Sequence, residues 1–475
     1  MVKEDVAELF CILDGADSIG GTKLVIHTDD GDIMIDFGLN YKKKSQYFDE
    51  FLSRRSQVGL KDYFTTGLLP RVHNIYREDL LKLSPKCSWE YSLKLSKVVI
   101  SHAHLDHAGM LPFLRPDVPV LCSVESHAIL LSLQETSGGK VENEFIRISK
   151  RELQTSKAHR RTVKGAQTSR EFSYEDDRIL TFSTDHSIPG ARMCAVKVQG
   201  VWIVYTGDFR FGGLRDAETR QAMRKISSLE GEKVIFVEGT RFNSKKKSKR
   251  ATERDVLDVL QRYISQYQGK LVVVDCGLRN IDRLSSVFEA SGKLNRTPVL
   301  MPKTFHLIET LLDFTDETRY RSILNQARVY IRKRNIRKWE KELLERSRTV
   351  DENDINKSPG SYVLCFNYYD ILELSDMNTT NGGYIYSNTE PFNEEMEIDL
   401  NRLRKWVSRL GMTFHGWEEE SPLHVSGHLS PNEVLEFLDS VQPVCVIPVH
   451  CEEPLEYSKF LQKNGFSVLN PLFPQ

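Results

Sequence analysis

The segment VVISHAHLDHAG, residues 98–109, constrains this chain more than any other. Within six positions, directly after an apolar run, it places three imidazoles and one carboxylate: His102, His104, Asp106 and His107. The run 97–100 predicts a short buried strand, and we expect a helix to begin after His107. Single histidines are usually ordinary polar residues, but imidazole and carboxylate are metal ligands, and four of them in this order offer donors to two adjacent ions. The segment therefore predicts a metal centre in a strand-to-helix turn.

Composition bounds the class of protein. The 475 residues, 40% hydrophobic and 28% charged, predict about two domains of a soluble globular protein. No apolar stretch is long enough for a bilayer, and the first residues carry acids where a signal peptide would carry bases. The eight cysteines are scattered without a Cys-x-x-Cys pair, which is typical of a reducing compartment. We therefore expect a cytoplasmic protein with no membrane partner.

The chain alternates strands with polar strand ends. Asp36, His186, Asp208 and Glu238 each follow or end an apolar run beside a glycine turn. Functional side chains are often held this way, on loops fixed by a rigid sheet. From about 251 to 420, helical stretches alternate with parallel-type strands, which predicts an α/β unit with a mostly parallel sheet.

Positive charge is clustered although the net charge is only −1. The basic stretches are 147–170, 241–250 (RFNSKKKSKR) and 331–341. Local patches of this kind decide whether phosphates are attracted, but solvated surface is an equal alternative for each stretch. A run such as Lys245–Lys247 should contribute to the salt dependence of RNA binding if it meets phosphates.

The order of the motifs resembles a known family. The motifs are Asp36, HAHLDH at 102–107, His186, Asp208, Glu238, HVSGH at 424–428 and PVH at 448–450. In this order they resemble the metallo-β-lactamase-fold nucleases of the β-CASP group, which includes RNase J and the 3′-end-processing nuclease of the cleavage and polyadenylation machinery. The resemblance covers nearly the whole chain. It implies an α/β fold, an αββα sandwich with an inserted β-CASP α/β domain, divided at 1–242, 243–424 and 425–475.

The resemblance also implies a metal set. His102, His104 and His186 would hold one ion, Asp106, His107 and His450 the other, and Asp208 would bridge both. Asp36 would orient a ligating imidazole through a hydrogen bond. The implied cofactor is a pair of Zn²⁺ ions, with Mn²⁺ as the alternative. Cys451, where relatives often have glycine, is expected to pack rather than to ligate.

Glu238 and His428 complete the implied chemistry. Two divalent ions can activate a hydroxide for in-line attack on a phosphodiester. His428, paired with Glu238, is the candidate proton donor to the leaving oxygen, with a role in positioning substrate as the alternative. Ser387, His424, Ser426 and Gly427 are candidates for a phosphate-binding pocket, and simple capping of turns is the equal alternative.

The resulting hypothesis is a zinc-dependent hydrolase, a ribonuclease that cuts single-stranded RNA in processing or decay as a 5′–3′ exonuclease, an endonuclease or both. Two alternatives remain open at this stage: a β-CASP DNA nuclease and a non-catalytic RNA-binding scaffold. Because inactive scaffolds have typically lost metal ligands, the presence of all seven ligand candidates argues against the last one. A homodimer is a further expectation, since relatives commonly dimerise.

Overall fold

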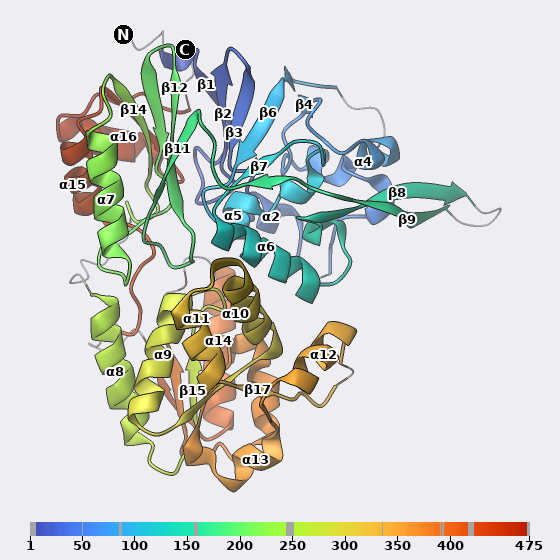
Figure 1. The fold of residues 1–475 in the computed structure, drawn as a ribbon, viewed down its shortest axis with the longest axis vertical. Helices are drawn as coiled ribbons and strands as arrows, with labels where there is room; N and C mark the ends of the chain where they lie inside the picture. Colours follow the sequence, from blue (N-terminus) through green and yellow to red (C-terminus); the bar gives the residue numbers. More distant parts are fainter. Residues whose placement is uncertain are drawn as a thin grey trace.

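The computed structural model describes residues 6–49, 51–84, 88–155, 160–243, 251–334, 336–389, 391, 394–416 and 422–472. The described residues form two lobes (Figure 1). The first lobe contains the described residues of 6–243 and 422–472, and the second lobe those of 251–416. Among all the residues described above, no helix has both the length and the apolar character needed to cross a membrane.

Two sheets make up the centre of the first lobe. The first sheet has the order β1 (Phe10–Asp14), β2 (Lys23–Thr28), β3 (Gly31–Ile35), β6 (Leu95–Val99), β7 (Val120–Leu121) and β10 (Phe172–Ser173). The second has the order β11 (Ile179–Ser183), β12 (Arg192–Val198), β13 (Val201–Tyr205), β14 (Lys233–Glu238) and β22 (Cys445–Val449). In each sheet the strands that end at the polar motifs run parallel, so their carboxyl ends share one edge.

The inner faces of the two sheets pack against each other and form an apolar core. It contains Ile26 and Ile35 from the first sheet and Ile203, Phe236 and Ile447 from the second, all buried. The strands that supply these residues are continuous apolar runs, as expected of strands covered on both faces. The lobe is therefore a sandwich whose inner faces exclude water.

Helices cover the outer faces of the sandwich. Against the first sheet lie α3 (Lys61–Thr65), α4 (Glu78–Leu83), α5 (Leu105–Ala108) and α6 (Val124–Thr136), with 3-10 turns at Leu111–Phe113 and Val141–Asn143. Helix α2 (Tyr41–Tyr47) and the 3-10 turn Ser56–Val58 have no buried residue. Against the second sheet lie α7 (Asp216–Ser227), α15 (Pro431–Val441) and α16 (Pro454–Lys463). A short pair, β4 (Val72–His73) and β5 (Tyr91–Ser92), lies beside them. The predicted αββα arrangement is confirmed.

The second lobe contains one wholly parallel sheet. Its order is β18 (Thr349–Val350), β17 (Arg328–Tyr330), β16 (Thr297–Leu300), β19 (Tyr362–Cys365), β15 (Val272–Asp275), β20 (Gly383–Tyr386) and β21 (Thr413–His415). One face packs on α8 (Glu253–Gln266), α9 (Ile281–Lys293), α10 (Pro302–Thr315) and α11 (Thr318–Gln326). The other packs on α14 (Glu394–Arg409) and the 3-10 segment η5 (Tyr368–Asp376). Shorter elements are α12 (Lys338–Arg346), α13 (Glu352–Lys357) and the 3-10 turn Pro359–Ser361.

The predicted α/β alternation from about 251 to 420 thus matches the observed strands and helices. The chain leaves the first lobe after β14 and returns to it at β22, which pairs with β14 in parallel from Val234 to Glu238. The domain boundaries at 242/243 and 424/425 stay a prediction. Residues 244–250, which include Lys245–Lys247, lie outside the described residues.

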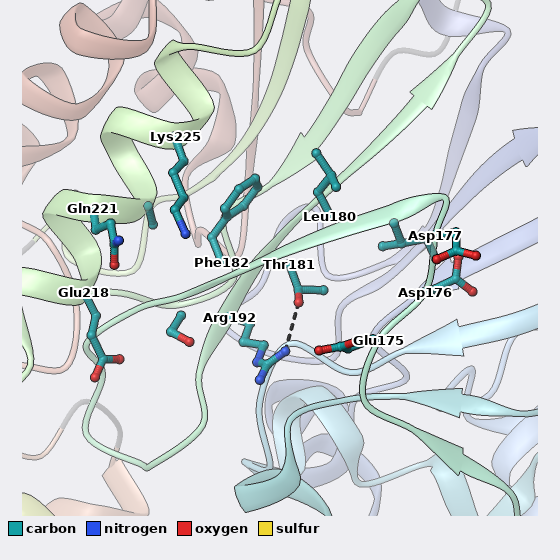
Figure 2. A pocket seen from close by; sticks show the side chains of 13 residues that line it. Glu175, Asp176, Asp177, Leu180, Thr181, Phe182, Arg192, Glu218, Gln221 and Lys225 are labelled. Carbon is teal, nitrogen blue, oxygen red and sulfur yellow. Dashed lines mark hydrogen bonds between the residues drawn. The ribbon is translucent and has the colours of Figure 1, made fainter.

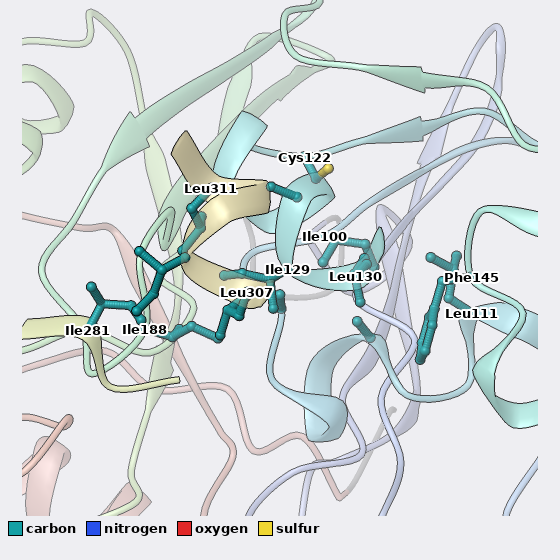
Figure 3. Packing of buried hydrophobic residues seen from close by; sticks show 14 of the residues in the cluster. Ile100, Leu111, Cys122, Ile129, Leu130, Phe145, Ile188, Ile281, Leu307 and Leu311 are labelled. Atoms are coloured by element: carbon teal, nitrogen blue, oxygen red, sulfur yellow. The ribbon is translucent and has the colours of Figure 1, made fainter. Parts of the chain in front are cut away.

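The lobes share a continuous apolar core. Helix α6 of the first lobe packs on α10 of the second, and Figure 3 shows Ile129 of α6 beside Leu307 of α10. Both side chains are buried. Because these helices bury apolar faces against each other, the two lobes are held as one body.

One local expectation needs correction, and one pair of strands was not predicted. Helix α5 begins at Leu105, before Asp106 and His107, and ends at Ala108. The backbone of His104 is extended and forms the N-cap, so the helix starts within the ligand motif. The basic stretch 147–170 holds a ribbon of two antiparallel strands, β8 (Arg147–Thr155) and β9 (Arg160–Ser169), which projects from the first lobe (Figure 1). The sequence did not indicate these strands, because the many charged residues hide the alternation that marks a strand.

Candidate metal centre

The parallel strand ends of both sheets bring the predicted ligands together. His102 and His104 follow β6, Asp106 and His107 lie in α5, and His186, Asp208 and His450 follow β11, β13 and β22. Two main groups of donors result: His102, His104 and His186 form one, and Asp106, His107, Asp208 and His450 form the other. A third group, His186, Asp208 and His428, shares two of its members with them. Within each group all ligand atoms lie within 4.8 Å of one another.

Asp208 lies between the two groups. Its Oδ2 is 3.1 Å from His107 Nε2, 3.7 Å from His102 Nε2 and 4.0 Å from His186 Nε2. Its Oδ1 is 3.2 Å from His450 Nδ1. The carboxylate therefore reaches both groups, which is the position of a bridging ligand.

Several donors in this centre lack ordinary partners. Asp208 Oδ1 and both ring nitrogens of His450 are buried without a hydrogen bond to any described residue. Leaving buried polar atoms unpaired costs free energy, so such atoms indicate a missing ligand. Imidazole and carboxylate are a suitable donor set for a divalent metal, and the residues fit one here.

Hydrogen bonds fix the orientation of two imidazoles. His107 donates through Nδ1 to Asp36 Oδ2 at 2.7 Å, which leaves Nε2 toward Asp208. His186 donates through Nδ1 to the carbonyl of Gly427 at 2.6 Å, which leaves Nε2 toward His104. In each case the distal nitrogen is free to ligate.

Asp36 is held by partners that the sequence did not single out. Its carboxylate accepts hydrogen bonds from the Ser101 amide and hydroxyl, both at 2.8 Å, and from the Tyr205 hydroxyl at 3.0 Å. The only signals were a serine just before His102 and a tyrosine that ends an apolar strand before Gly207-Asp208. With φ 58°, Asp36 adopts the left-handed backbone, as does His450 with φ 52°. Strained backbone of this kind is concentrated at functional sites.

Burial and charge set the protonation of the ligands. Burial lowers the pKa of His102 and His186 well below the ordinary value and that of His104 to about 4, so these imidazoles are neutral donors. Burial also opposes charge on His107, but the nearby carboxylates of Asp208, Asp106 and Asp36 raise its pKa well above the ordinary range. Without metal, His107 thus partly neutralises the acids around it.

Glu238 and His428 lie at the edge of the centre. Glu238 Oε2 accepts from His428 Nδ1 at 2.8 Å and from the Thr240 hydroxyl at 2.6 Å, and Oε1 accepts from the Phe209 amide. Burial opposes charge on His428, but Glu238 and then Asp208 raise its pKa to about 9. His428 Nδ1 is 3.8 Å from Asp208 Oδ2, so the pair adjoins both donor groups.

Exposure shows where the centre opens. The side chains of Asp106 and His428 are each 22% exposed, whereas the other donors that Asp208 contacts are at most 1% exposed. A substrate can therefore approach along the side on which Asp106 and His428 lie.

The predicted phosphate-binding residues have structural partners. The Ser387 hydroxyl donates to the Leu423 carbonyl and accepts from Arg283, and it is buried. The Ser426 hydroxyl accepts from the His428 amide at 3.1 Å. Gly427 holds His186 through its carbonyl. His424 has a buried Nδ1 with no hydrogen bond to a described residue, and burial, with Arg283 next, lowers its pKa to about 3.

Cys451 packs in the apolar cluster behind the second sheet, beside Tyr457. It belongs to none of the donor groups found among the described residues. Burial raises the pKa of its thiol to about 12, which disfavours the thiolate that a metal needs. The expectation that it packs fits this position.

A hollow lies apart from these residues, between β11 and α7 (Figure 2). Glu175, Asp176 and Glu218 line it together with Arg192 and Lys225. Arg192 donates to the Thr181 hydroxyl at 2.9 Å, as the dashed line in Figure 2 shows. None of the predicted site residues lines this hollow.

Glycines allow the loops to approach the ligand helix. A Cβ on Gly38 would lie 1.6 Å from the Asp106 carbonyl oxygen. We expect Gly38→Ala to lower the free energy of unfolding by about 2–3 kcal/mol and to weaken metal binding, because the loop must move away from α5. Gly138→Ala is the matched control, since a Cβ there meets nothing within 4 Å. Urea unfolding and metal titration check both, and equal values for the two variants would contradict this reading.

Comparisons with known proteins agree with the motifs. No family model matches the chain. Ribonuclease J of Mycolicibacterium smegmatis is 23% identical over 363 residues, which are 75% of this chain and 58% of that protein. Ribonuclease J of Helicobacter pylori strain J99 is 21% identical over 464 residues, 93% of this chain and 55% of that protein. The chain thus spans less than two thirds of the length of these curated relatives.

A solved structure matches the whole fold. A protein of unknown function from Enterococcus faecalis V583 has a TM-score of 0.69 and 19% sequence identity, and the match covers 97% of both chains. That likeness concerns the arrangement of both lobes, because it extends over nearly every residue. By sequence, the chain is a relative of the ribonuclease J proteins, and its resemblance to the metallo-β-lactamase-fold nucleases of the β-CASP group is confirmed.

Proposed function

We propose that the chain is a metal-dependent ribonuclease that hydrolyses the phosphodiester bonds of single-stranded RNA. The observation that carries the proposal is the position of Asp208 between two donor groups, with the Glu238–His428 pair at their edge. The curated relatives named Ribonuclease J support RNA as the substrate. Zinc is the proposed metal, because the donors are mainly imidazoles, with manganese as the alternative.

We assign His102, His104 and His186 to one ion, Asp106, His107 and His450 to the other, and Asp208 to both. Two bound ions would supply a water of lowered pKa and positive charge for the phosphoryl oxygens. Asp36 orients His107, and Gly427 orients His186. Glu238 holds His428 through Nδ1, so Nε2 can donate a proton to the leaving oxygen.

The remaining assignments concern substrate phosphates, cellular location and oligomeric state. We propose His424 and Ser426 as contacts for a substrate phosphate, because His424 Nδ1 lacks a partner among the described residues. Ser387 and Gly427 would shape this pocket from behind. The seven described cysteines form no disulfide, which supports a reducing location such as the cytoplasm. A homodimer stays a prediction.

The test uses the purified protein and RNA of defined ends. We expect about two divalent ions per chain, hydrolysis of single-stranded RNA, and loss of hydrolysis on chelation with recovery on adding zinc or manganese. Linear RNA with a 5′-monophosphate or a 5′-triphosphate, circular RNA and single-stranded DNA distinguish exonuclease, endonuclease and DNA nuclease action. Hydrolysis that survives chelation, or cleavage of DNA alone, would refute the proposal.

The Glu238–His428 pair yields a separate prediction. We expect His428→Ala to lower kcat by about 10²–10⁴-fold while the metal content stays at the parent level, because His428 donates a proton and its Nδ1 is held by Glu238. His428 also forms a third donor group with His186 and Asp208, so the metal content must be measured. Glu238→Gln should lower kcat less, since it keeps a hydrogen bond to Nδ1. Single-turnover rates and elemental analysis measure both effects. A His428→Ala variant that has lost its metal would instead assign His428 to the ligands.

A further inference from the structure

Strand β11 is an open edge of the second sheet. Among the described strands it pairs with β12 alone, and it comes first in the strand order. All five residues of β11 line the hollow that Figure 2 shows. Ile179 packs in the core between the sheets and Phe182 in the cluster behind the second sheet, so both faces of the strand contribute. The hollow therefore follows the edge of β11 and not one face of the sheet.

The pairing with β12 shows which backbone groups of β11 point outward. The Thr184 amide donates to the Ala191 carbonyl at 2.9 Å, one step beyond the pair of Ser183 and Arg192. Hydrogen-bonded and non-hydrogen-bonded pairs alternate along antiparallel strands, so Thr181 and Ser183 direct their amides and carbonyls away from β12. No backbone group of a described residue bonds to them there. These four groups are open to another strand.

Helix α7 forms the second wall of the hollow. Its residues Glu218, Gln221 and Lys225 line the same hollow as β11 (Figure 2). An unpaired strand edge can take up an extended peptide, which gains main-chain hydrogen bonds from the strand and specificity from pockets for its alternate side chains. A peptide along β11 would meet backbone groups on one side and the polar side chains of α7 on the other.

The charge of the lining favours a cationic peptide. Acids outnumber bases, since the charged lining residues are Glu175, Asp176, Asp177 and Glu218 against Arg192 and Lys225. Asp176 pairs with Lys97. The carboxylates of Glu175, Asp177 and Glu218 form no hydrogen bond or ion pair with another described residue. They are therefore available to lysine or arginine side chains of an incoming strand.

The same charge disfavours two other occupants. Excess acid repels the phosphates of a nucleic acid. A second copy of the chain would bring the same excess of acids to the pairing, and like charges on facing strands are destabilising. A basic segment of a different protein meets neither obstacle.

We propose that β11 and α7 form a docking site for an extended basic segment of a partner protein, which pairs with the backbone of Thr181 and Ser183 and adds a strand to the second sheet. Its lysine or arginine side chains lie beside the acids of the hollow. None of the residues that line the hollow belongs to the donor groups of the metal centre. The proposal thus goes beyond RNA hydrolysis and does not depend on it.

The first test uses fluorescein-labelled, capped heptapeptides and fluorescence anisotropy. The probes carry lysine or arginine at alternate positions, with valine, threonine or tyrosine between them. We expect the parent protein to bind them, and N-methylation of the alternate amides that face β11 to weaken binding by about tenfold or more, because it removes donors and blocks close approach. The same peptides with glutamate in place of the bases should not bind. Absence of binding by every basic probe, or equal binding of the methylated forms, would refute the proposal.

A pair of variants at Ser183 locates the binding. Ser183→Pro removes the outward amide and should weaken binding of the tightest probe by about tenfold, whereas Ser183→Ala keeps the amide and should bind like the parent. Proline is tolerated where the amide of an edge strand faces solvent, and urea unfolding checks that both variants fold. Parent affinity in Ser183→Pro would contradict pairing at this edge.

Hydrogen exchange gives a second readout on the unaltered protein. Amides without a partner exchange readily, so we expect a saturating basic probe to slow exchange within β11. Unchanged exchange in β11 while the probe is bound would place the binding elsewhere and overturn the proposal.

The acids are tested by Glu218→Gln. It should weaken binding of the basic probe about threefold and reduce its dependence on salt, because one attractive charge is lost. Glu395→Gln is the matched control, since Glu395 is exposed on α14 of the second lobe and loses the same charge. Equal affinities of the two variants would refute recognition by charge.

Two further outcomes would name another occupant. A dimer of the parent that Ser183→Pro dissociates in analytical ultracentrifugation would assign the edge to a second copy and refute the partner peptide. Displacement of the basic probe by a single-stranded oligonucleotide in Glu238→Gln and parent alike, with slowed exchange in β11, would assign the hollow to nucleic acid and refute it as well.

Discussion

Asp208→Ala should abolish RNA hydrolysis, with a loss of at least about a thousandfold, and should remove most of the bound metal. Among the described residues, Asp208 is the carboxylate whose oxygens reach both main donor groups, with distances of 3.7 Å to His102 and 3.1 Å to His107. Its removal leaves one group with imidazoles alone and leaves Asp106 as the carboxylate of the other. Elemental analysis and single-turnover cleavage of labelled RNA measure both effects.

The control for this variant is Asp399→Ala. Asp399 is a surface acid of α14 that pairs with Arg402, so its loss removes a carboxylate of the same size outside the centre. It should keep the parent's metal content and rate. An Asp208→Ala protein that holds two ions and cuts at the parent rate would show that the metal centre is wrongly placed.

The largest expected effect on stability comes from the buried ion network between the lobes. Arg210 of the first lobe donates to Asp185 at 2.8 Å, to Glu253 at 3.1 Å and to Asp282 at 3.2 Å, and the latter two belong to the second lobe. All four side chains are at most 1% exposed. We expect Arg210→Met to lower the free energy of unfolding by about 3–5 kcal/mol, because buried Asp185 loses the side chain that pairs with it. Glu253 keeps Arg283 and Asp282 keeps Arg215, but each loses one of its buried cationic partners.

A surface pair provides the comparison. Arg402→Met breaks the exposed contact between Arg402 and Asp399 and should leave the free energy of unfolding close to that of the parent, because solvent screens this pair. Urea unfolding of the two variants beside the parent measures the difference. Similar midpoints for Arg210→Met and the parent would show that the network contributes little to the docking of the lobes.

The sequence predicted the fold where the pattern is local. The apolar runs at β6, β13, β14 and β15 identified strands because buried parallel strands need continuous apolar residues. It misplaced the start of α5, because a ligand-rich motif resembles a loop while its helical turn is fixed by packing. It also missed the β8–β9 ribbon, whose many charges conceal its strands.

The sequence by itself determined the candidate chemistry of the centre: seven side chains of types that can bind metal, spaced at the ends of apolar runs, with an acid–histidine pair. The capacity of imidazole and carboxylate to bind metal follows from the residue type alone. The resemblance to a family then assigns a role to each residue from the order of the motifs. Only the tertiary structure decided which atoms converge, because the relevant contacts join residues as distant along the chain as His186 and Gly427. It alone buried Arg210 between the lobes. No local pattern marks this residue, because its role arises from the docking of two lobes and not from its neighbours in sequence.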